Sequence, residues 1–476
     1  MPRSPFVLLL ACATALLGCA ASQPAEAQPA RQARPEIRGT WMTTTANDAI
    51  SSPEKTAESM ARLREIGLNT VYVECWKNGY TEFPSRVMDE LIGVPMKING
   101  APPELQRDLV DETLNAAHRE GLVYIAWFEY GFMAAHKDTN NTLRQKFPEW
   151  MTLTHDGQMV GEQNPFVWMN PLRPESRKLL LGIVLEAVDK YDLDGVQLDD
   201  RIAWPVTMGY DPYTIEVYKR EHRGKAPPDD PRDPEWVQWR ADKVTEFAGE
   251  FYRELKEARP NLIVSISPAI WRWSLDNYAC DWPRWIRNGW MQEYLPQVYR
   301  PTYARFAADW PRQVKAGGRR PKDVIAGIAI NLSAGDLSWD ELEKKIDITR
   351  RIGRGGHCHW FSRGVLETHP EELLAYYDVE RKGQAPHPGL PRGWRPAPIV
   401  LEQEHDMPFP KEGMSYWRVH ETPHRPYRVI GLHKGAWETI GPYPGGMAED
   451  SLITTDAKYE AVELLVDRRE DEPFER

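Results

Sequence analysis

The chain has 476 residues, of which 41% are hydrophobic and 27% are charged, a balance typical of a folded protein rather than a disordered one. Its formal net charge of −11 argues against a nucleic-acid partner, because a protein that binds a polyanion needs a basic surface stripe. After the N-terminal segment, no stretch approaches the ~18 apolar residues that a membrane-spanning helix requires.

Residues 1–27 have the pattern of an export signal. Arg3 provides the positive charge, residues 6–17 are apolar, and Leu16-Leu17-Gly18-Cys19 resembles a bacterial lipobox in which Cys19 is lipidated. Cleavage after Ala25-Glu26-Ala27 is the alternative. Both alternatives predict an exported protein, either a periplasmic or outer-membrane lipoprotein or a secreted protein, with a lipid on Cys19 as its only expected membrane attachment. A flexible tether is expected over residues 20–34, which are rich in Ala, Gln and Pro.

Residues 36–378 alternate short β-rich runs with helical segments. The expected strands are Ile37–Thr44, Thr70–Cys75, Val123–Glu129, Gly195–Asp199, Ile263–Pro268, Met291–Tyr299, Val324–Asn331 and His357–Phe361. The clearest helical segments are Ser52–Ile66, Glu104–Arg119, Pro174–Tyr191, Pro234–Ala258 and Ser338–Ile352, with Ser52 and Ser338 as candidate N-caps. Eight strands that each precede a helix predict a (β/α)8 TIM barrel, an α/β fold. A doubly wound sheet is less suitable, because no glycine-rich phosphate turn follows the first strand.

The remaining chain differs from this pattern. Residues 379–398 contain Pro386, Pro388, Pro391, Pro396 and Pro398 and predict a Pro-rich linker or strap. Residues 399–476 alternate aromatic and polar residues and predict a small β-rich C-terminal appendage. Within the barrel, extra length falls at 76–103, 130–173 and 201–233, in loops that a barrel of this type places on its active-site face.

Three cysteines remain after processing, Cys75, Cys280 and Cys358, without the spacing of a metal site. Cys75 and Cys358 lie in strand-like runs, so we expect buried thiols rather than a disulfide.

The strongest chemical signal is the acidic end of the fourth expected strand, Asp199-Asp200-Arg201. Side chains alternate along a strand, so Gln197 and Asp199 share one side and Leu198 takes the other. If Leu198 packs against the helices, Asp199 projects into the barrel mouth. Glycosidic bond cleavage needs one carboxylate as nucleophile or base and one carboxylic acid as proton donor. The alternative is that the two acids only cap a helix or pair with Arg201.

Other acids and polar residues lie at the ends of neighbouring strands. Glu74 and Glu129 end the second and third strands, and each is a candidate proton donor or sugar ligand, or a partner in a salt bridge. Glu293 comes early in its strand, so we expect it near the barrel floor. Gln297 and Tyr299 should reach the mouth and hydrogen-bond substrate, and Gln197 and Arg201 are further expected substrate ligands.

The last strand carries His357 and His359 on one side, as candidate glycan ligands. A metal held by these histidines and the aspartates has less support, because no third ligand is suitably spaced, and no metal or other cofactor is expected. A ring of tryptophans at the strand ends is typical of a sugar site, where indoles stack on pyranose faces. Its expected members are Trp41, Trp76, Trp127, Trp271, Trp273 and Trp360.

Six ordered motifs resemble the glycosyl hydrolase-like 10 family over residues 36–378. They are Leu68-Asn69-Thr70-Val71-Tyr72-Val73, Tyr124–Phe128, Trp168-Met169-Asn170-Pro171, Asp194–Asp200, Ile266-Ser267-Pro268 and Pro296-Gln297-Val298-Tyr299. The family is similar to α-amylase and α-galactosidase barrels, whose nucleophile ends the fourth strand, and this resemblance assigns that role to Asp199. The family often has Gln at position 74, Asn at 129 and Tyr at 201, so it leaves the proton donor open between Asp200 and Glu129.

The resemblance implies a bacterial cell-envelope glycan as substrate, including peptidoglycan strands stripped of their peptides. The leading hypothesis is therefore a glycoside hydrolase, with retention or inversion left open. Two alternatives remain: a glycan-binding lipoprotein without catalysis, and a metal-dependent carbohydrate deacetylase that uses Asp199, Asp200, His357 and His359.

Overall fold

A computed structural model of the chain describes residues 33–137, 139–161, 165–420, 425–443, 451–469 and 471. The proposed export signal, including Cys19, lies outside these residues. No helix within the described ranges is both long and apolar enough to cross a membrane.

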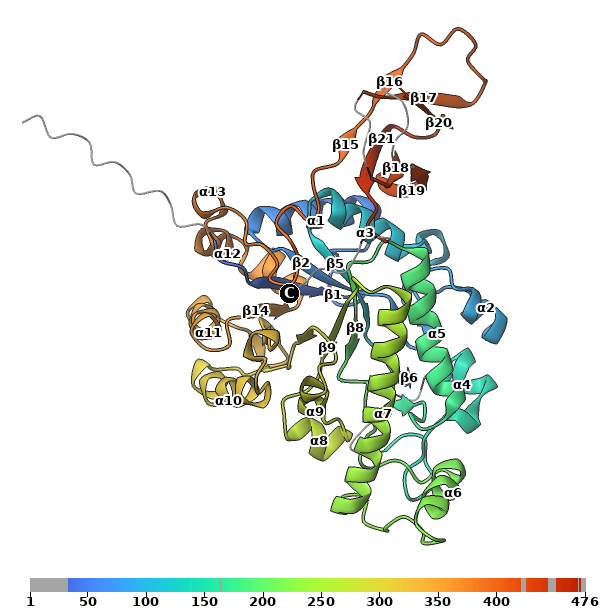
Figure 1. Ribbon diagram of the computed structural model, residues 1–476, viewed down its shortest axis with the longest axis vertical. Helices are drawn as coiled ribbons and strands as arrows, with labels where there is room; N and C mark the ends of the chain where they lie inside the picture. Colours follow the sequence, from blue (N-terminus) through green and yellow to red (C-terminus); the bar gives the residue numbers. More distant parts are fainter. Residues whose placement is uncertain are drawn as a thin grey trace, which may run out of the picture.

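Eight parallel strands form the centre of the molecule (Figure 1). They are β1 (Ile37–Met42), β2 (Thr70–Glu74), β5 (Val123–Phe128), β8 (Gly195–Asp199), β9 (Ile263–Ser267), β10 (Glu293–Tyr294), β11 (Ala326–Ala329) and β14 (Gly356–Trp360). The sheet order is β10-β9-β8-β5-β2-β1-β14-β11. Parallel bridges Tyr294–Val324 and Gln297–Gly327 join its two edges, so the sheet closes into a barrel. All eight strands correspond to those expected from the sequence.

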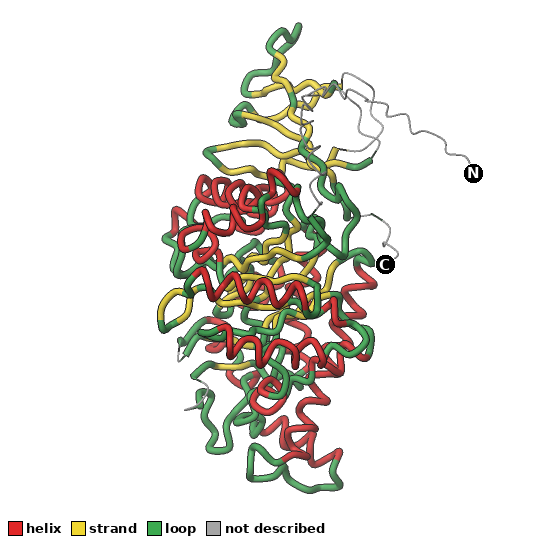
Figure 2. Tube along the Cα trace, turned by 90° about the vertical axis from the view of Figure 1, so that its left-hand side faces the viewer, coloured by secondary structure: helices red, strands yellow, loops and turns green. Residues whose placement is uncertain are grey.

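Helices surround these strands on the outside, as Figure 2 shows most clearly. The helices are α1 (Pro53–Ile66), α2 (Arg86–Ile92), α3 (Leu109–Arg119), α4 (Thr142–Lys146), α5 (Pro174–Lys190), α6 (Pro212–Glu221), α7 (Pro234–Ala258), α8 (Trp273–Tyr278), α9 (Trp282–Arg287), α10 (Tyr303–Ala316), α11 (Trp339–Arg351), α12 (Pro370–Tyr377) and α13 (Val379–Lys382). Ser52 caps α1 by accepting a hydrogen bond from Lys55 N at 3.3 Å. Ser338 stands at the N-cap of α11, but among the described residues its side chain makes no capping bond.

Short hairpins occupy three of the loops that follow barrel strands. They pair β3 (Trp76–Lys77) with β4 (Tyr80–Thr81), β6 (Met133–Ala135) with β7 (Val167–Trp168), and β12 (Asn331–Leu332) with β13 (Gly335–Asp336). The first two hairpins and the loop that contains α6 coincide with the extra chain length expected after the second, third and fourth strands.

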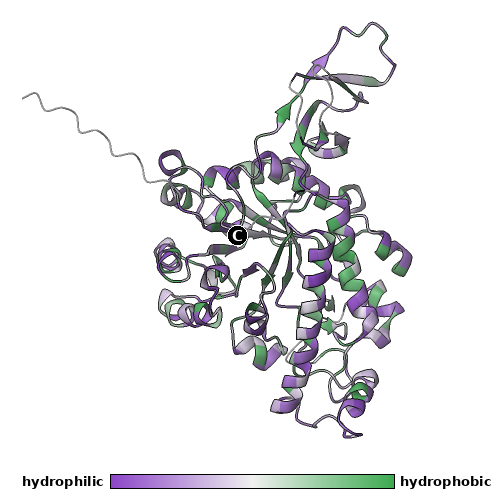
Figure 3. Ribbon diagram, viewed as in Figure 1, coloured by the Kyte–Doolittle hydropathy of each residue, from purple (hydrophilic) through white to green (hydrophobic). Residues whose placement is uncertain are grey.

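Apolar side chains form two separate layers in the barrel. The larger layer lies between the strands and the helices, and Figure 3 shows hydrophobic residues along the strands and on one side of α5 and α7. The smaller layer fills the barrel interior and includes Trp41, Tyr72, Trp127 and Leu295. A residue on a barrel strand therefore faces either the interior or the helices, according to its parity in the strand.

The C-terminal region forms two antiparallel sheets that project from the molecule beside α1 and α3 (Figure 1). Its strands are β15 (Ile399–Val400), β16 (Glu402–Glu404), β17 (Met414–Val419), β18 (Tyr427–His433), β19 (Ala436–Tyr443), β20 (Ser451–Asp456) and β21 (Ala461–Val466). Strand β19 packs on α3, and Arg428 of β18 reaches Asp192, which precedes β8, at 2.7 Å. The β-rich appendage is therefore docked on the barrel.

The cysteines agree with the sequence-based expectation. Cys75, Cys280 and Cys358 are free thiols and are buried.

Candidate active site

Strand β8 delivers Asp199 to the barrel interior. Gly195 begins the strand where a Cβ would lie 2.6 Å from both the Ile125 side chain and the Ile263 carbonyl oxygen, so only glycine permits this close strand packing. Leu198 faces the helices and Gln197 faces the interior, as predicted from their alternation. Asp199 lies two residues after Gln197 and therefore also faces the interior. Because it is the last residue of β8, its carboxylate lies at the C-terminal end of the barrel.

Three side chains hold the Asp199 carboxylate. Its Oδ1 accepts hydrogen bonds from Ser267 Oγ and Gln297 Nε2, both at 2.7 Å. Its Oδ2 contacts the Arg201 guanidinium. Burial and the neighbouring Asp200 carboxylate raise the pKa of Asp199 to about 7, while Arg201 and Ser267 oppose that rise. Three donors orient this carboxylate, and it ionises near neutral pH.

One nitrogen of Arg201 connects the three acids that the sequence singles out as catalytic. Arg201 Nη1 contacts Asp199 and lies 3.5 Å from both Asp200 Oδ1 and Glu129 Oε1. It also donates to the Glu129 carbonyl oxygen at 3.2 Å. The structure thus brings Asp199, Asp200 and Glu129 together, although Arg201 is itself engaged by these carboxylates.

Glu74 has no surface from which to contact a sugar. Its side chain is 0% exposed and forms an ion pair with Lys77 Nζ at 2.7 Å. Lys77 Nζ also lies 3.8 Å from Glu129 Oε2, so the ion pair adjoins the acids at the barrel mouth. The predicted role of Glu74 in binding substrate is corrected to a buried structural position behind Glu129.

Two aromatic side chains, Trp360 and Tyr299, remain partly exposed beside the acids. Their rings are 6.1 Å apart at an interplanar angle of 28°. Gln297, two residues before Tyr299, bonds Asp199, so this aromatic pair belongs to the same end of the barrel. Trp271 is also partly exposed and packs edge-on against Trp282, with ring centroids 6.3 Å apart.

Several other predicted sugar ligands are buried. Trp41 and Trp127 lie beneath Trp360, with ring centroids at 6.2 and 6.0 Å, and Trp41 donates from Nε1 to Gln197 Oε1 at 2.7 Å. Gln197 also donates a hydrogen bond from its Nε2 to Ser265 Oγ at 2.9 Å, so both ends of its amide are engaged within the protein. These three residues support the site from below rather than contacting substrate.

Trp76 packs in the layer between strands and helices and donates its indole N–H to the Gly131 carbonyl oxygen at 3.1 Å. Its predicted contact with substrate is therefore wrong. The reason is that Trp76 follows the end of β2 in a hairpin, where strand alternation no longer determines its direction.

The two histidines of β14 share a side, as predicted, but that side faces the helices. His357 Nε2 and His359 Nε2 lie 2.6 and 3.2 Å from the Tyr377 hydroxyl of α12. Cys358 faces the barrel interior. The wall of strands therefore separates both histidines from Asp199, which corrects their assignment as glycan ligands and removes the ligand set of the deacetylase alternative.

Within the described part of the chain, no group of three or more His, Cys, Asp and Glu side chains has the arrangement of a metal site.

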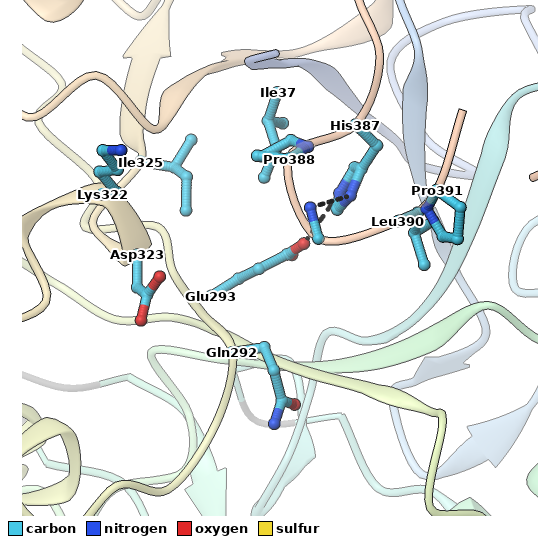
Figure 4. Close-up of a pocket in the computed structure, with 11 residues that line it drawn as sticks. Ile37, Gln292, Glu293, Lys322, Asp323, Ile325, His387, Pro388, Leu390 and Pro391 are labelled. Carbon is cyan, nitrogen blue, oxygen red and sulfur yellow. Dashed lines mark hydrogen bonds and ion pairs between the residues drawn. The ribbon is translucent and has the colours of Figure 1, made fainter. Parts of the chain in front are cut away.

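A cavity of roughly 550 Å³ lies at the other end of the barrel (Figure 4). It is lined by residues at the starts of strands, such as Ile37 and Glu293, and by the strap segment 387–391. Glu293 accepts a hydrogen bond from the Tyr72 hydroxyl at 3.0 Å and lies 3.1 Å from His387 Nε2. This position agrees with the expectation that Glu293 lies near the barrel floor, away from the acids on β8.

Sequence reasoning missed Lys77 and its hydroxyl neighbours Thr43 and Thr44. Lys77 lies three residues after Glu74 in a hairpin, a spacing that carries no recognisable signal outside a helix. Thr43 and Thr44 end the first expected strand, where the sequence indicates no role for them, yet both donate to Glu74, at 2.6 and 2.5 Å. The sequence does contain one signal for this contact, because Thr43 and Thr44 are polar residues at the end of an otherwise apolar strand.

The sequence of this chain is similar to a known protein family and to two named glycosyl hydrolases. The profile of the family described as glycosyl hydrolase-like 10 matches residues 36–341. Glycosyl hydrolase DigH of Escherichia coli K12 is 24% identical over 333 residues, which cover 61% of this chain and 72% of the relative. Glycosyl hydrolase YngK of Bacillus subtilis is 25% identical over 260 residues, covering 51% of this chain and 47% of the relative.

Among solved structures, the glycoside hydrolase domain of PgaB (BpsB) from Bordetella bronchiseptica superimposes with a TM-score of 0.53 at 15% identity. The alignment covers 72% of this chain and 99% of that domain. The catalytic domain of β-amylase from Paenibacillus polymyxa gives a TM-score of 0.51 at 9% identity, covering 73% of this chain and 98% of that domain. These structures share the barrel fold.

Proposed function

Because the chain belongs to the glycosyl hydrolase-like 10 family, we propose that it is a glycoside hydrolase that cleaves O-glycosidic bonds in a polysaccharide. One observation carries this proposal: Asp199 ends the fourth barrel strand facing the interior, and Arg201 Nη1 contacts both it and Glu129. Two carboxyl groups at one barrel mouth are the minimum that this chemistry requires.

Asp199 acts as the nucleophile or base. The hydrogen bonds from Ser267 and Gln297 fix the direction of its carboxylate, and its pKa near 7 leaves it ionised in mildly alkaline solution. Trp360 and Tyr299 provide apolar faces on which a sugar ring stacks.

Glu129 is the better of the two candidate proton donors. Burial and the charge of Glu74 raise the pKa of Glu129 to about 8, so it retains its proton at neutral pH. The Asp200 side chain is 22% exposed, against 11% for Glu129. A more exposed carboxyl group is better solvated when charged and holds a proton less strongly.

The proposed substrate is a bacterial cell-envelope glycan, including peptidoglycan strands stripped of their peptides. The family resemblance implies this class of substrate, and the export signal proposed for residues 1–27 would bring the protein to it. Lipidation of Cys19 remains part of this proposal.

The test is to incubate the purified protein with peptide-free peptidoglycan glycan and a panel of polysaccharides, and to analyse the products by mass spectrometry. We expect Asp199→Asn to abolish cleavage and to change the melting temperature by only a few degrees. Asp309→Asn on α10, where Asp309 pairs with Arg300, is the matched control and should leave cleavage intact. Cleavage by Asp199→Asn at the wild-type rate would refute the assignment.

The contact between Arg201 and Asp199 favours one second candidate, a glycan-binding protein without catalysis. A guanidinium bound to the nucleophile weakens it and occupies space between the two carboxyl groups. Such a protein would bind oligosaccharide by calorimetry yet release no new reducing ends during prolonged incubation.

A further inference from the structure

Three buried carboxyl groups surround the ammonium group of Lys77. Glu74, Glu82 and Glu129 all raise the pKa of Lys77, although they come from β2, the segment after β4 and the end of β5. Lys77 Nζ donates to both oxygens of Glu74, at 2.8 and 2.7 Å, but lies 3.8 Å from Glu129. One cation cannot neutralise three buried carboxylates, so the geometry decides which of them stays charged.

Glu74 is the charged member. Besides Lys77, the hydroxyl groups of Thr43 and Thr44 donate to it, so each of its oxygens receives two hydrogen bonds. Burial raises the pKa of Glu74, but Lys77 and these hydrogen bonds outweigh burial and lower it overall.

Glu82 is a neutral member. Thr44 Oγ1 lies 3.1 Å from Glu82 Oε1, but its only hydrogen is already directed to Glu74. A proton on Glu82 allows this carboxyl group to donate to Thr44 instead, which completes a chain from Glu82 through Thr44 to Glu74. Burial and the charge of Glu74 raise the pKa of Glu82 well above its ordinary value.

Glu129 has a cation near one oxygen only, since Arg201 Nη1 lies 3.5 Å from its Oε1. Among the described residues no donor bonds its buried Oε2, which lies beside the carboxyl group of Glu74. A proton on Glu129 satisfies this atom by donating to the ionised Glu74. The proton also relieves the repulsion between the two groups.

We propose that Glu74 is a positioning residue whose ion pair with Lys77 makes Glu129 carry the proton that the departing sugar needs. This inference rests on the proposed function. In the reaction, the Glu129 carboxyl group turns about its Cγ–Cδ bond so that the protonated oxygen leaves Glu74 and takes the side that faces Arg201. The Glu129 O–H bond then breaks and its proton bonds the glycosidic oxygen. The bond from that oxygen to the anomeric carbon breaks at the same time, and its electron pair passes to the oxygen. Either an Asp199 oxygen forms the new bond to the carbon, or a water does so and gives its proton to Asp199. Glu129 is left as a carboxylate.

The charges around Glu129 act in both directions. Glu74 and Asp199 raise its pKa, whereas Arg201 and Lys77 lower it. Glu82 and Asp200 complete the ring of acids, and burial is the largest cause that raises the pKa of each. Glu74 follows burial as the largest of these influences, so it is the residue to change.

The test compares wild type with Glu74→Gln, which retains shape and removes charge. The pH at which Glu129 titrates is followed by the infrared carbonyl band of its protonated carboxyl group, assigned by its loss in Glu129→Gln. We expect a band that titrates near pH 8 in wild type and at least about one pH unit lower in Glu74→Gln. The alkaline limb of kcat/KM should move by the same amount.

Glu112→Gln is the matched control, because Glu112 is another buried glutamate paired with a cation, Arg107, but lies on α3. It should leave the band in place. An unshifted band in folded Glu74→Gln overturns the inference. If that variant fails to fold, a wild-type Glu129 that titrates near 4.5 overturns it equally. Because the infrared titration needs no substrate, it remains decisive even if no glycan is cleaved, which would count only against the proposed function.

Discussion

Replacing Arg395 with methionine tests how firmly the strap and the C-terminal sheets are fixed to the barrel. The Arg395 guanidinium donates to Asp192 Oδ2 at 2.6 Å and to Asp194 Oδ1 at 2.7 Å, just before β8. It also donates to the Val466 carbonyl oxygen of β21 at 2.9 Å. All three side chains of this cluster are at most 3% exposed.

The loss of Arg395 removes the guanidinium that pairs with the buried Asp194. Its remaining partners are the Tyr124 amide, the indole N–H of Trp394 and the His118 ring, at 2.8, 2.6 and 2.9 Å. Burial and the charge of Arg395 lower the pKa of His118 to about 4, so in the wild type its ring is neutral at pH 7 and Arg395 is the cation that pairs with Asp194. Removing one partner of a buried ion pair typically costs about 3–5 kcal/mol, and we expect the free energy of unfolding to fall by this amount.

The assay is equilibrium unfolding in urea at pH 7, followed by tryptophan fluorescence and circular dichroism. Arg381→Met is the matched control, because Arg381 pairs with Asp378 while 70% exposed. It should change stability by no more than about 0.5 kcal/mol. If Arg395→Met costs less than about 1 kcal/mol, the cluster does not hold the C-terminal region to the barrel.

Two further predictions concern pH. In wild type, kcat/KM should rise as Asp199 loses its proton near pH 7 and fall as Glu129 loses its proton near pH 8, so an initial-rate profile should peak between these values. A broad plateau from pH 5 to 7 would contradict these roles. Because the unfolded chain protonates His118 near 6.5 and the folded chain only near 4, stability should fall by up to about 3 kcal/mol as pH drops through this window. His118→Gln should flatten that part of a urea-midpoint profile, and an unchanged slope would exclude His118 as its source.

The strand positions could be predicted because each barrel strand is a short apolar run followed by a helical pattern. Alternation along the fourth strand also predicted the inward direction of Asp199, since Leu198 is apolar and Gln197 is polar. The same rule was insufficient at β14. It placed His357 and His359 together, but both sides of that strand carry residues that suit a buried environment, so parity alone could not identify the inner face.

The Glu74–Lys77 pair was missed for a different reason. Its formation depends on the hairpin that turns Lys77 back over β2 and on hydroxyl groups from the segment that follows β1, contacts that no local pattern encodes. The cluster around Arg395 is even harder to predict from the sequence, because Asp194 and Arg395 are separated by 201 positions in the chain. Buried charges far apart in sequence become partners only once the fold is known.

The packed interior of the barrel has a consequence for turnover. Trp41, Tyr72 and Trp127 occupy its axis between the cavity at the floor and the acids at the mouth. A barrel filled in this way is a solid core and not a channel. Under the proposed function, cleaved fragments therefore leave through the opening by which the glycan arrived, and a fragment that stays there competes directly with the next chain.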